Sequence, residues 1–204
     1  KMVIQIKLAK SPSDADLVFK LRHKILIEEE KIDTERNDSR YYDFFDTFDK
    51  SANFIAIKDD NVPIGSIRLT QYSEVGLPAE RYFDFQLYFE QVNEKIVDCS
   101  MLCIDKEYRS EPKLILGLLL MGYYWCYLRN VEYILATVTP DQVAYLKMMG
   151  FQELAVSSMA VETNLKPMLL KVKKVNDVFV NYVKQQKFFS YLGHFERAIY
   201  SKGE

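Results

Sequence analysis

The sequence predicts an α/β protein with a central mixed, twisted β-sheet of about seven strands and helices on both faces. Short β-type runs alternate with helical patterns along the chain, and a hairpin near residue 60 precedes strands that are joined through helices. The stretch 114–128 carries no charged residue and is typical of a helix buried against a sheet. Strands joined through helices run parallel and are covered on both faces, so a mixed sheet is expected.

The individual elements follow from periodicity and from turn residues. Pro12 after a serine marks a helix start, because proline suits the first helical turn and a serine hydroxyl caps it. The turn residues at 59–63 predict an antiparallel hairpin, and Gly150 ends a short helix. The expected strands are 3–8, 54–57, 64–70, 96–104, 133–138, 151–161 and 167–172, and the expected helices are 12–28, 113–129, 139–150 and 176–192.

Length and composition favour one globular domain. The chain has 204 residues, of which 49% are hydrophobic and 27% charged, a balance typical of a chain that folds around a single core. No internal repeat, low-complexity tract or flexible linker divides it. We therefore expect one domain over 1–204, with residues 176–204 as a C-terminal helical extension.

Charge and cysteine usage exclude several classes of function. A formal net charge of −2 offers no basic field for a phosphate backbone, so no nucleic-acid partner is expected. Three cysteines without metal-type spacing predict a reducing compartment and no metal site. The first residues lack the pattern of a secretion signal, and the longest apolar stretch is shorter than the ~20 residues of a membrane span. A cytoplasmic protein without an integral membrane segment is the expectation.

The segment 104–151 carries the first resemblance to a known family. It combines IDKEYR at 104–109, a long apolar helix, a strand, Thr139-Pro140 and the closing KMMGF at 147–151. This order resembles the central motif of Gcn5-related N-acyltransferases. The resemblance implies that two parallel strands, 96–104 and 133–138, splay apart and that backbone groups in the resulting cleft pair with the pantetheine arm of an acyl thioester.

The same resemblance assigns donor-binding residues. The pantetheine arm would lie along Leu102, Cys103 and Ile104, and its phosphate would meet Arg109, Lys113 and the start of the following helix, where free N–H groups favour an anion. The loop RSEPKL at 109–114 departs from the family pattern because it has no glycine and contains an acid. Leu146 stands where many acetyl-transferring members have a tyrosine, and Tyr145 is one residue away. These departures favour a donor on acyl carrier protein, which presents a single phosphate.

Four segments of the N-terminal half resemble one branch of that superfamily, the N-acyl amino acid synthases and acyl-homoserine-lactone (autoinducer) synthases. In order they read LRHKILIEE at 21–29, DFFD at 43–46, GSIRL at 65–69 and DCSMLCI at 98–104. The resemblance covers residues 17–151. Asp98 replaces a glutamate of the family pattern and Met101 an arginine, and both changes count against homoserine-lactone synthesis in particular.

The implied reaction is the attack of an amine on a thioester carbonyl. A carboxylate, or a water that it holds, must take the proton of the amine. Backbone N–H groups near residues 102–104 would stabilise the developing oxyanion. The resemblance assigns the base to Asp98, the placement of the amine to Asp43 and Asp46, the acceptor carboxylate to Arg68, and further positioning of the acceptor to Arg22 and Ser100.

Several alternatives stay open at the level of sequence. Arg22 and Arg68 can form ion pairs with Asp43 and Asp46 that tie the first helix to the hairpin, and Cys103 can be a small buried hydrophobic residue rather than a nucleophile. No tightly bound cofactor is expected, since acyl carrier protein or coenzyme A supplies the acyl group as a co-substrate. A small-molecule N-acetyltransferase that uses coenzyme A is the second hypothesis. A catalytically inactive relative that binds lipid or a partner protein is the third.

Overall fold

The computed structural model describes residues 4–29, 52–58, 62–85, 88–89, 95–156, 158 and 164–172. The chain divides into two compact units. Unit 1 comprises Lys1–Leu69 and Met101–Gly122, and unit 2 comprises Thr70–Ser100 and Tyr123–Glu204. One domain over the whole chain therefore stays a prediction. The loop expected at 41–46 and the helix expected at 176–192 lie outside the described residues.

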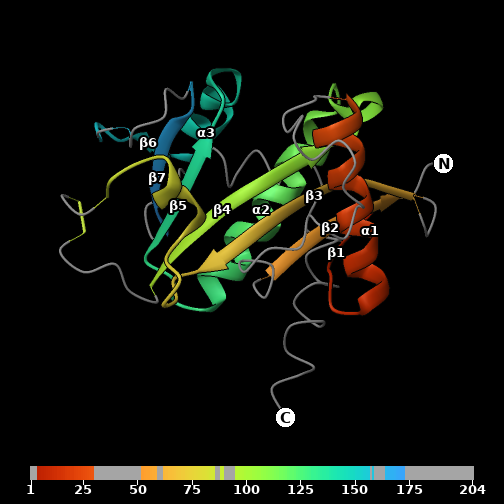
Figure 1. Ribbon diagram of the computed structural model, residues 1–204, viewed down its shortest axis with the longest axis horizontal. Helices are drawn as coiled ribbons and strands as arrows, with labels where there is room; N and C mark the ends of the chain where they lie inside the picture. The colour runs from red at the N-terminus through yellow and green to blue at the C-terminus, as the bar shows by residue number, and fades with distance from the viewer. Residues whose placement is uncertain are drawn as a thin grey trace, which may run out of the picture. The chain divides into compact units, whose positions relative to one another are not determined.

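The strands form one mixed sheet of seven strands in the order β1-β2-β3-β4-β5-β7-β6 (Figure 1). Neighbours β1/β2, β2/β3, β5/β7 and β6/β7 are antiparallel, whereas β4 and β5 are parallel. The predicted fold class is confirmed. The strands are β1 (Ile4–Leu8), β2 (Ala52–Lys58), β3 (Val62–Gln71), β4 (Ile96–Ile104), β5 (Tyr133–Val138), β6 (Gln152–Glu153) and β7 (Lys166–Lys171).

In unit 1, helix α1 (Pro12–His23) covers one face of the strands (Figure 1). It begins as the sequence predicts. The Ser11 hydroxyl accepts a hydrogen bond from the Asp14 N–H, and the Asp14 carboxylate accepts one from the Ser11 N–H. Its apolar side packs Val18 against Ile55 and Ile57 of β2. The chain then continues as a π-helix, η1 (Lys24–Glu29).

Helix α2 (Pro112–Leu128) covers the opposite face of the unit 1 strands (Figure 1). The contact is close at Gly65 of β3, where an added Cβ would lie 3.0 Å from Leu118 Cδ1 and 3.1 Å from Ile104 Cδ1. Only glycine leaves room there for the helix to approach the strand. Helices on both faces of the sheet are therefore confirmed for this unit.

Unit 2 is built around an apolar cluster. A 3₁₀ turn, η5 (Pro78–Arg81), and the following residues pack on the first part of β4 and on β5. A second turn, η7 (Pro140–Gln142), leads into α3 (Val143–Met149), which ends at Gly150 with a left-handed φ of 106°. The buried members of the cluster are Leu77, Ala79, Phe83, Phe85, Ile96 and Leu135.

The strand expected at 151–161 differs in the structure. Among the described residues of that range, only Gln152 and Glu153 form a strand, β6, because the pairing with β7 covers these two residues. Within β4, Met101 has a φ of 52°, in the left-handed region that L-residues in a regular strand do not adopt. Within the described part of the chain, no helix has the length and hydropathy that crossing a membrane requires.

Candidate functional site

Strand β4 supplies the framework of the site. Its register with β5 runs from Ile96 opposite Tyr133 to Cys99 opposite Ala136 and ends there, although β4 continues to Ile104. Both strands lie within the described residues. The expectation that these strands are parallel neighbours is confirmed, whereas the cleft between them stays a prediction. The left-handed Met101 lies just beyond the last pair. Strained backbone of this kind is common at binding sites.

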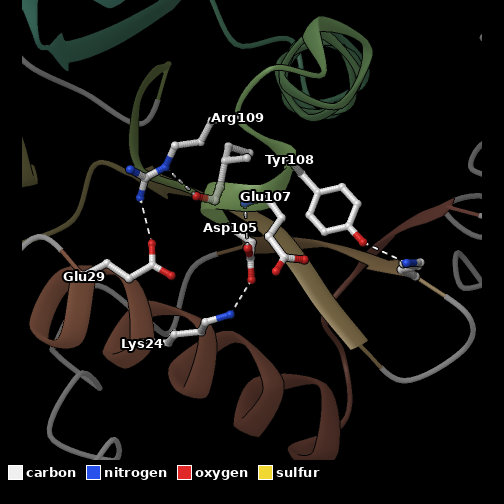
Figure 2. Close-up of polar contacts among 8 residues, drawn as sticks. Lys24, Glu29, Asp105, Glu107, Tyr108 and Arg109 are labelled. Atoms are coloured by element: carbon white, nitrogen blue, oxygen red, sulfur yellow. Dashed lines mark hydrogen bonds and ion pairs between the residues drawn. The ribbon is translucent and has the colours of Figure 1, made fainter.

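The segment after β4 is held by a buried carboxylate. Asp105 is 5% exposed, and its Oδ1 accepts the Glu107 N–H, which starts the 3₁₀ turn η6 (Lys106–Tyr108). Its Oδ2 accepts a hydrogen bond of 2.5 Å from Lys24 Nζ (Figure 2). Burial alone would raise the pKa of Asp105, but the hydrogen bonds from Lys24 and Glu107 outweigh burial and lower it. The bond to Asp105 raises the pKa of Lys24.

Arg109, expected at the donor phosphate, is part of the same network. Its Nε donates to the Ile104 carbonyl oxygen at 3.1 Å, and its Nη2 donates to Glu29 Oε2 at 3.1 Å (Figure 2). The Glu29 side chain is 12% exposed and that of Arg109 43%. Glu29 Oε1 is buried and, within the described residues, accepts no hydrogen bond. The guanidinium therefore neutralises a carboxylate that has little access to water.

The π-helix explains why Lys24 and Glu29 both reach this loop. Residues five apart on an α-helix lie about 140° apart around its axis. In a π-helix the hydrogen bonds run between residues five apart, so such residues come close to the same side. Figure 2 shows both side chains pointing from η1 toward the segment 104–109.

Tyr108 and Lys113 complete the loop. Lys58 Nζ donates to the Tyr108 hydroxyl at 2.9 Å and lies 5.5 Å from the centre of its ring. Lys113, in the first turn of α2, is exposed. The stretch 105–113 contains three acids and three bases and so has no net charge. Its electrostatic attraction for a polyphosphate is correspondingly weak.

A second polar group lies buried in unit 1 on the face that α1 covers. Arg22 is 0% exposed and its Nη2 donates to Asn53 Oδ1 at 2.6 Å. Asn53 stands opposite Arg68 in the antiparallel register of β2 and β3, and Arg68 is 2% exposed. Ser66, two pairs along on the same face of the strands, is also fully buried. The structure thus brings Arg22 and Arg68, both predicted site residues, to neighbouring positions.

Asp98, the predicted base, lies in unit 2 and is 0% exposed. Its Oδ2 accepts the Ala79 N–H at 2.8 Å, which ties η5 to β4. Asp98 is therefore closed off from solvent, and its role as the base stays a prediction. Burial, followed by the charge of Asp98, raises the pKa of the neighbouring Cys99 thiol far above its usual range.

The remaining predicted residues are placed as follows. Cys103 is buried with Leu21 and Ile25, which fits the apolar reading of that cysteine, while Ser100 and Leu102 are half-buried on β4. On α3, Leu146 is buried and Tyr145 is exposed, so they point to different sides as expected. Asp43 and Asp46 lie outside the described residues.

Sequence reasoning missed three residues that carry the network. Lys24 and Glu29 fell within a quoted motif but received no role, because helical periodicity places them on different sides and only the π-helix unites them. Asn53 gave no motif signal. A polar residue at the start of an apolar strand, opposite an arginine of the hairpin, was the available cue.

Comparison with known proteins gives one family match. The family model of the N-acyl amino acid synthase FeeM matches residues 17–173, more than half of the chain. No curated protein sequence matches. This match agrees with the branch that the motifs at 21–29, 65–69 and 98–104 resemble.

Solved structures share the fold at low identity. The structure of FeeM from uncultured soil microbes has a TM-score of 0.65 and 12% identity, over 85% of this chain and 93% of that chain. The coenzyme A-dependent acyl-homoserine lactone synthase BjaI, solved with MTA, has a TM-score of 0.68 and 17% identity, over 91% and 89%. Tetrahymena GCN5 has a TM-score of 0.55 and 13% identity, over 82% and 96%. At such identities these likenesses show the fold alone.

Proposed function

Because the chain belongs to the FeeM N-acyl amino acid synthase family and is an acyltransferase of that type, we propose that it transfers a long acyl group from acyl carrier protein to the amine of an amino acid or a similar small molecule. The nitrogen attacks the thioester carbonyl, a C–N bond forms, the C–S bond breaks, and the carrier thiolate leaves. The amine proton passes to a base. The observation that carries the proposal is the end of the β4/β5 register at Cys99, with β4 continuing to Ile104.

In this proposal β4 receives the donor. The amide groups of the pantetheine arm pair with the backbone of Leu102, Cys103 and Ile104, and an N–H group of that stretch stabilises the oxyanion. Arg109 and Lys113 lie on the way from β4 to α2 and contact the phosphate. A donor with one phosphate suits a loop that has no net charge and no glycine.

The acceptor is proposed to bind through charged groups. Arg68, supported by Arg22 and Asn53, holds its carboxylate, because a guanidinium matches a carboxylate with two parallel hydrogen bonds. Asp43 and Asp46 are proposed to hold the amine, and Ser100 to help position it. Since Asp98 is buried, it acts as the base through a bridging water rather than by direct contact.

The experiment is a turnover assay. The purified protein is incubated with acyl-carrier and coenzyme A thioesters of short and long chain together with pooled amino acids, and new amides are identified by mass spectrometry. Long-chain N-acyl amino acids formed from the carrier-bound donor support the proposal. Acetylated products formed only from acetyl-coenzyme A would instead identify a small-molecule N-acetyltransferase. Absence of turnover with every donor would point to an inactive relative.

The setting proposed for this reaction is the cytoplasm. The three cysteines of the sequence have no metal-type spacing, a usage that suits a reducing compartment. Fractionation of the producing cells, followed by detection of the protein in the soluble cytoplasmic fraction, tests this part separately.

A further inference from the structure

The pairing of Arg109 with Glu29 bears on the choice of acyl donor. Arg109 is a guanidinium at the point where the donor phosphate is proposed to lie, and its Nη2 is already bonded to Glu29 at 3.1 Å. The carboxylate is mostly buried, and within the described part of the chain its second oxygen accepts no hydrogen bond. Arg109 therefore supplies the hydrogen-bonded cation that compensates the charge of Glu29, and the nearby Lys24 ammonium adds a weaker favourable interaction without a hydrogen bond.

We propose that Glu29 is a specificity-determining residue that disfavours coenzyme A relative to a carrier-bound phosphopantetheine. The inference rests on the proposed function, since it concerns the same donor site. A phosphate group that takes over the guanidinium leaves Glu29 as a mostly buried carboxylate without its hydrogen-bonded cation, which is costly even with Lys24 nearby. Coenzyme A has two phosphate groups more than phosphopantetheine, so a free guanidinium at this position would strengthen its binding the most. The pairing of Arg109 with Glu29 therefore weakens the binding of coenzyme A more than that of phosphopantetheine.

The ion pair of Lys24 with Asp105 also supports this arrangement. It holds the segment after β4 against the π-helix that carries Glu29, so η1 and this segment are joined by two ion pairs, Lys24–Asp105 and Glu29–Arg109 (Figure 2). Arg109 is further anchored through Nε to the Ile104 carbonyl. Glu29 thus acts on the donor through Arg109 and needs no contact of its own with the substrate.

The test compares binding of two probes, coenzyme A and 4′-phosphopantetheine, by titration calorimetry. Glu29→Gln is expected to tighten coenzyme A binding about three- to tenfold and 4′-phosphopantetheine binding by less than about twofold. Glu28→Gln is the matched control, because Glu28 is adjacent, has a 61% exposed side chain and pairs with His23 instead of Arg109. It removes the same charge and is expected to leave the ratio of the two affinities unchanged.

Two further variants keep the test decisive. Arg109→Gln added to Glu29→Gln is expected to abolish the gain. Glu29→Asp keeps the charge but shortens the side chain, so an intermediate gain in coenzyme A affinity is expected. This variant is used for the test if thermal unfolding shows that Glu29→Gln does not fold. Equal effects of the substitutions at 28 and 29, or an unchanged affinity ratio, overturn the inference. Because binding is measured without turnover, its failure is distinct from absence of amide product in the assay above.

Discussion

The two compact units bury different kinds of side chains. Unit 2 encloses aromatic and aliphatic residues around η5, β4 and β5. Unit 1 has an apolar face under α2 but buries polar and charged groups on the face under α1 and at the loop after β4. Among the described residues, the buried polar or charged ones in unit 1 are Asp14, Arg22, Asn53, Ser66, Arg68 and Asp105, whereas unit 2 has Thr70 and Asp98.

This difference shows where hydrogen bonding rather than apolar packing sets the structure. Alternation along β2 and β3 directs Phe54, Ile67 and Gly65 toward α2 and Asn53 and Arg68 toward the other side. A buried polar group is costly when it loses its hydrogen-bond partner, so substitutions at these positions of unit 1 should act through lost hydrogen bonds. In unit 2 they should act through lost volume, with Asp98 as the exception.

The largest expected effect is that of a substitution at Asp98, the buried carboxylate of unit 2. Asp98→Asn keeps an oxygen that can accept the Ala79 N–H but removes the charge that a base needs. If Asp98 takes the amine proton through water, kcat falls about 10²- to 10⁴-fold with little change in the thermal unfolding midpoint. Steady-state kinetics and a melting curve on the same preparation measure both.

Two further variants show whether the loss of kcat comes from the charge of Asp98 or from its hydrogen bond. Asp98→Ala also removes the bond to Ala79, so it is expected to lower stability as well as kcat. Glu74→Gln removes an exposed charge of unit 2 and is expected to change neither. Near-normal kcat in Asp98→Asn together with low kcat in Asp98→Ala would make Asp98 a positioning residue for η5 and not the base.

The next effect concerns the polar side of unit 1. Arg22→Met leaves the buried Asn53 Oδ1 without its donor at 2.6 Å, and we expect a loss of about 3 kcal/mol in the free energy of unfolding. In unit 2, Phe83→Leu keeps an apolar side chain and is expected to cost less, about 1–1.5 kcal/mol. Denaturant titrations measure both values.

A double-mutant cycle separates the bond from general disruption. Asn53→Leu combined with Arg22→Met should cost clearly less than the two single substitutions added together, because both remove the same hydrogen bond. Strictly additive losses would mean that Arg22 and Asn53 stabilise unit 1 independently. The contrast between the polar and apolar units would then rest on other residues.

Much of the fold was predictable because it depends on local signals. The strands 96–104 and 133–138 match β4 and β5 at both ends, and the Ser11 cap, the hairpin and Gly150 follow from capping and turn chemistry. These signals act over a few residues and need no knowledge of tertiary contacts. The strand predicted at 151–161 failed because its length depends on its partner β7.

The site was less predictable because its geometry departs from regular periods. Helical spacing cannot place Lys24 and Glu29 together, and strand alternation cannot anticipate the left-handed Met101. The burial of Asp98 also depends on η5, a turn distant in sequence that donates the Ala79 N–H to the Asp98 carboxylate. Motifs pointed to the right segments, whereas the contacts within them required three-dimensional structure.

The pH dependence of the loop after β4 gives a smaller effect. Because the folded-state pKa of Asp105 is lowered, its contribution to stability is present above the unfolded value of about 3.9 and is lost as the pH falls through the folded value. Lys24 has a raised pKa, so its contribution is lost only as the pH rises through that value in the alkaline range.

Asp105→Asn should lower the free energy of unfolding by about 1 kcal/mol at neutral pH, with the difference shrinking below about pH 4. Urea titrations at several pH values measure it, and a difference that stays constant as the pH falls from 7 through the acid range would contradict the ion pair as its source.

The smallest effect tests a surface contact of unit 2, just beyond the end of α2. Arg129 lies 4.1 Å from the centre of the Trp125 ring, and its charge also faces the helix C-terminus. Arg129→Gln removes both interactions and is expected to cost about 0.5–1 kcal/mol, whereas Arg129→Lys keeps the charge but loses the planar stacking and should cost about half as much. Trp125 is the single tryptophan of the chain, so its fluorescence during denaturation reports on the environment that the substitution changes. Equal losses in the free energy of unfolding of the two variants would assign the effect to stacking alone. No loss in either variant would show that Arg129 does not contribute to the stability of unit 2.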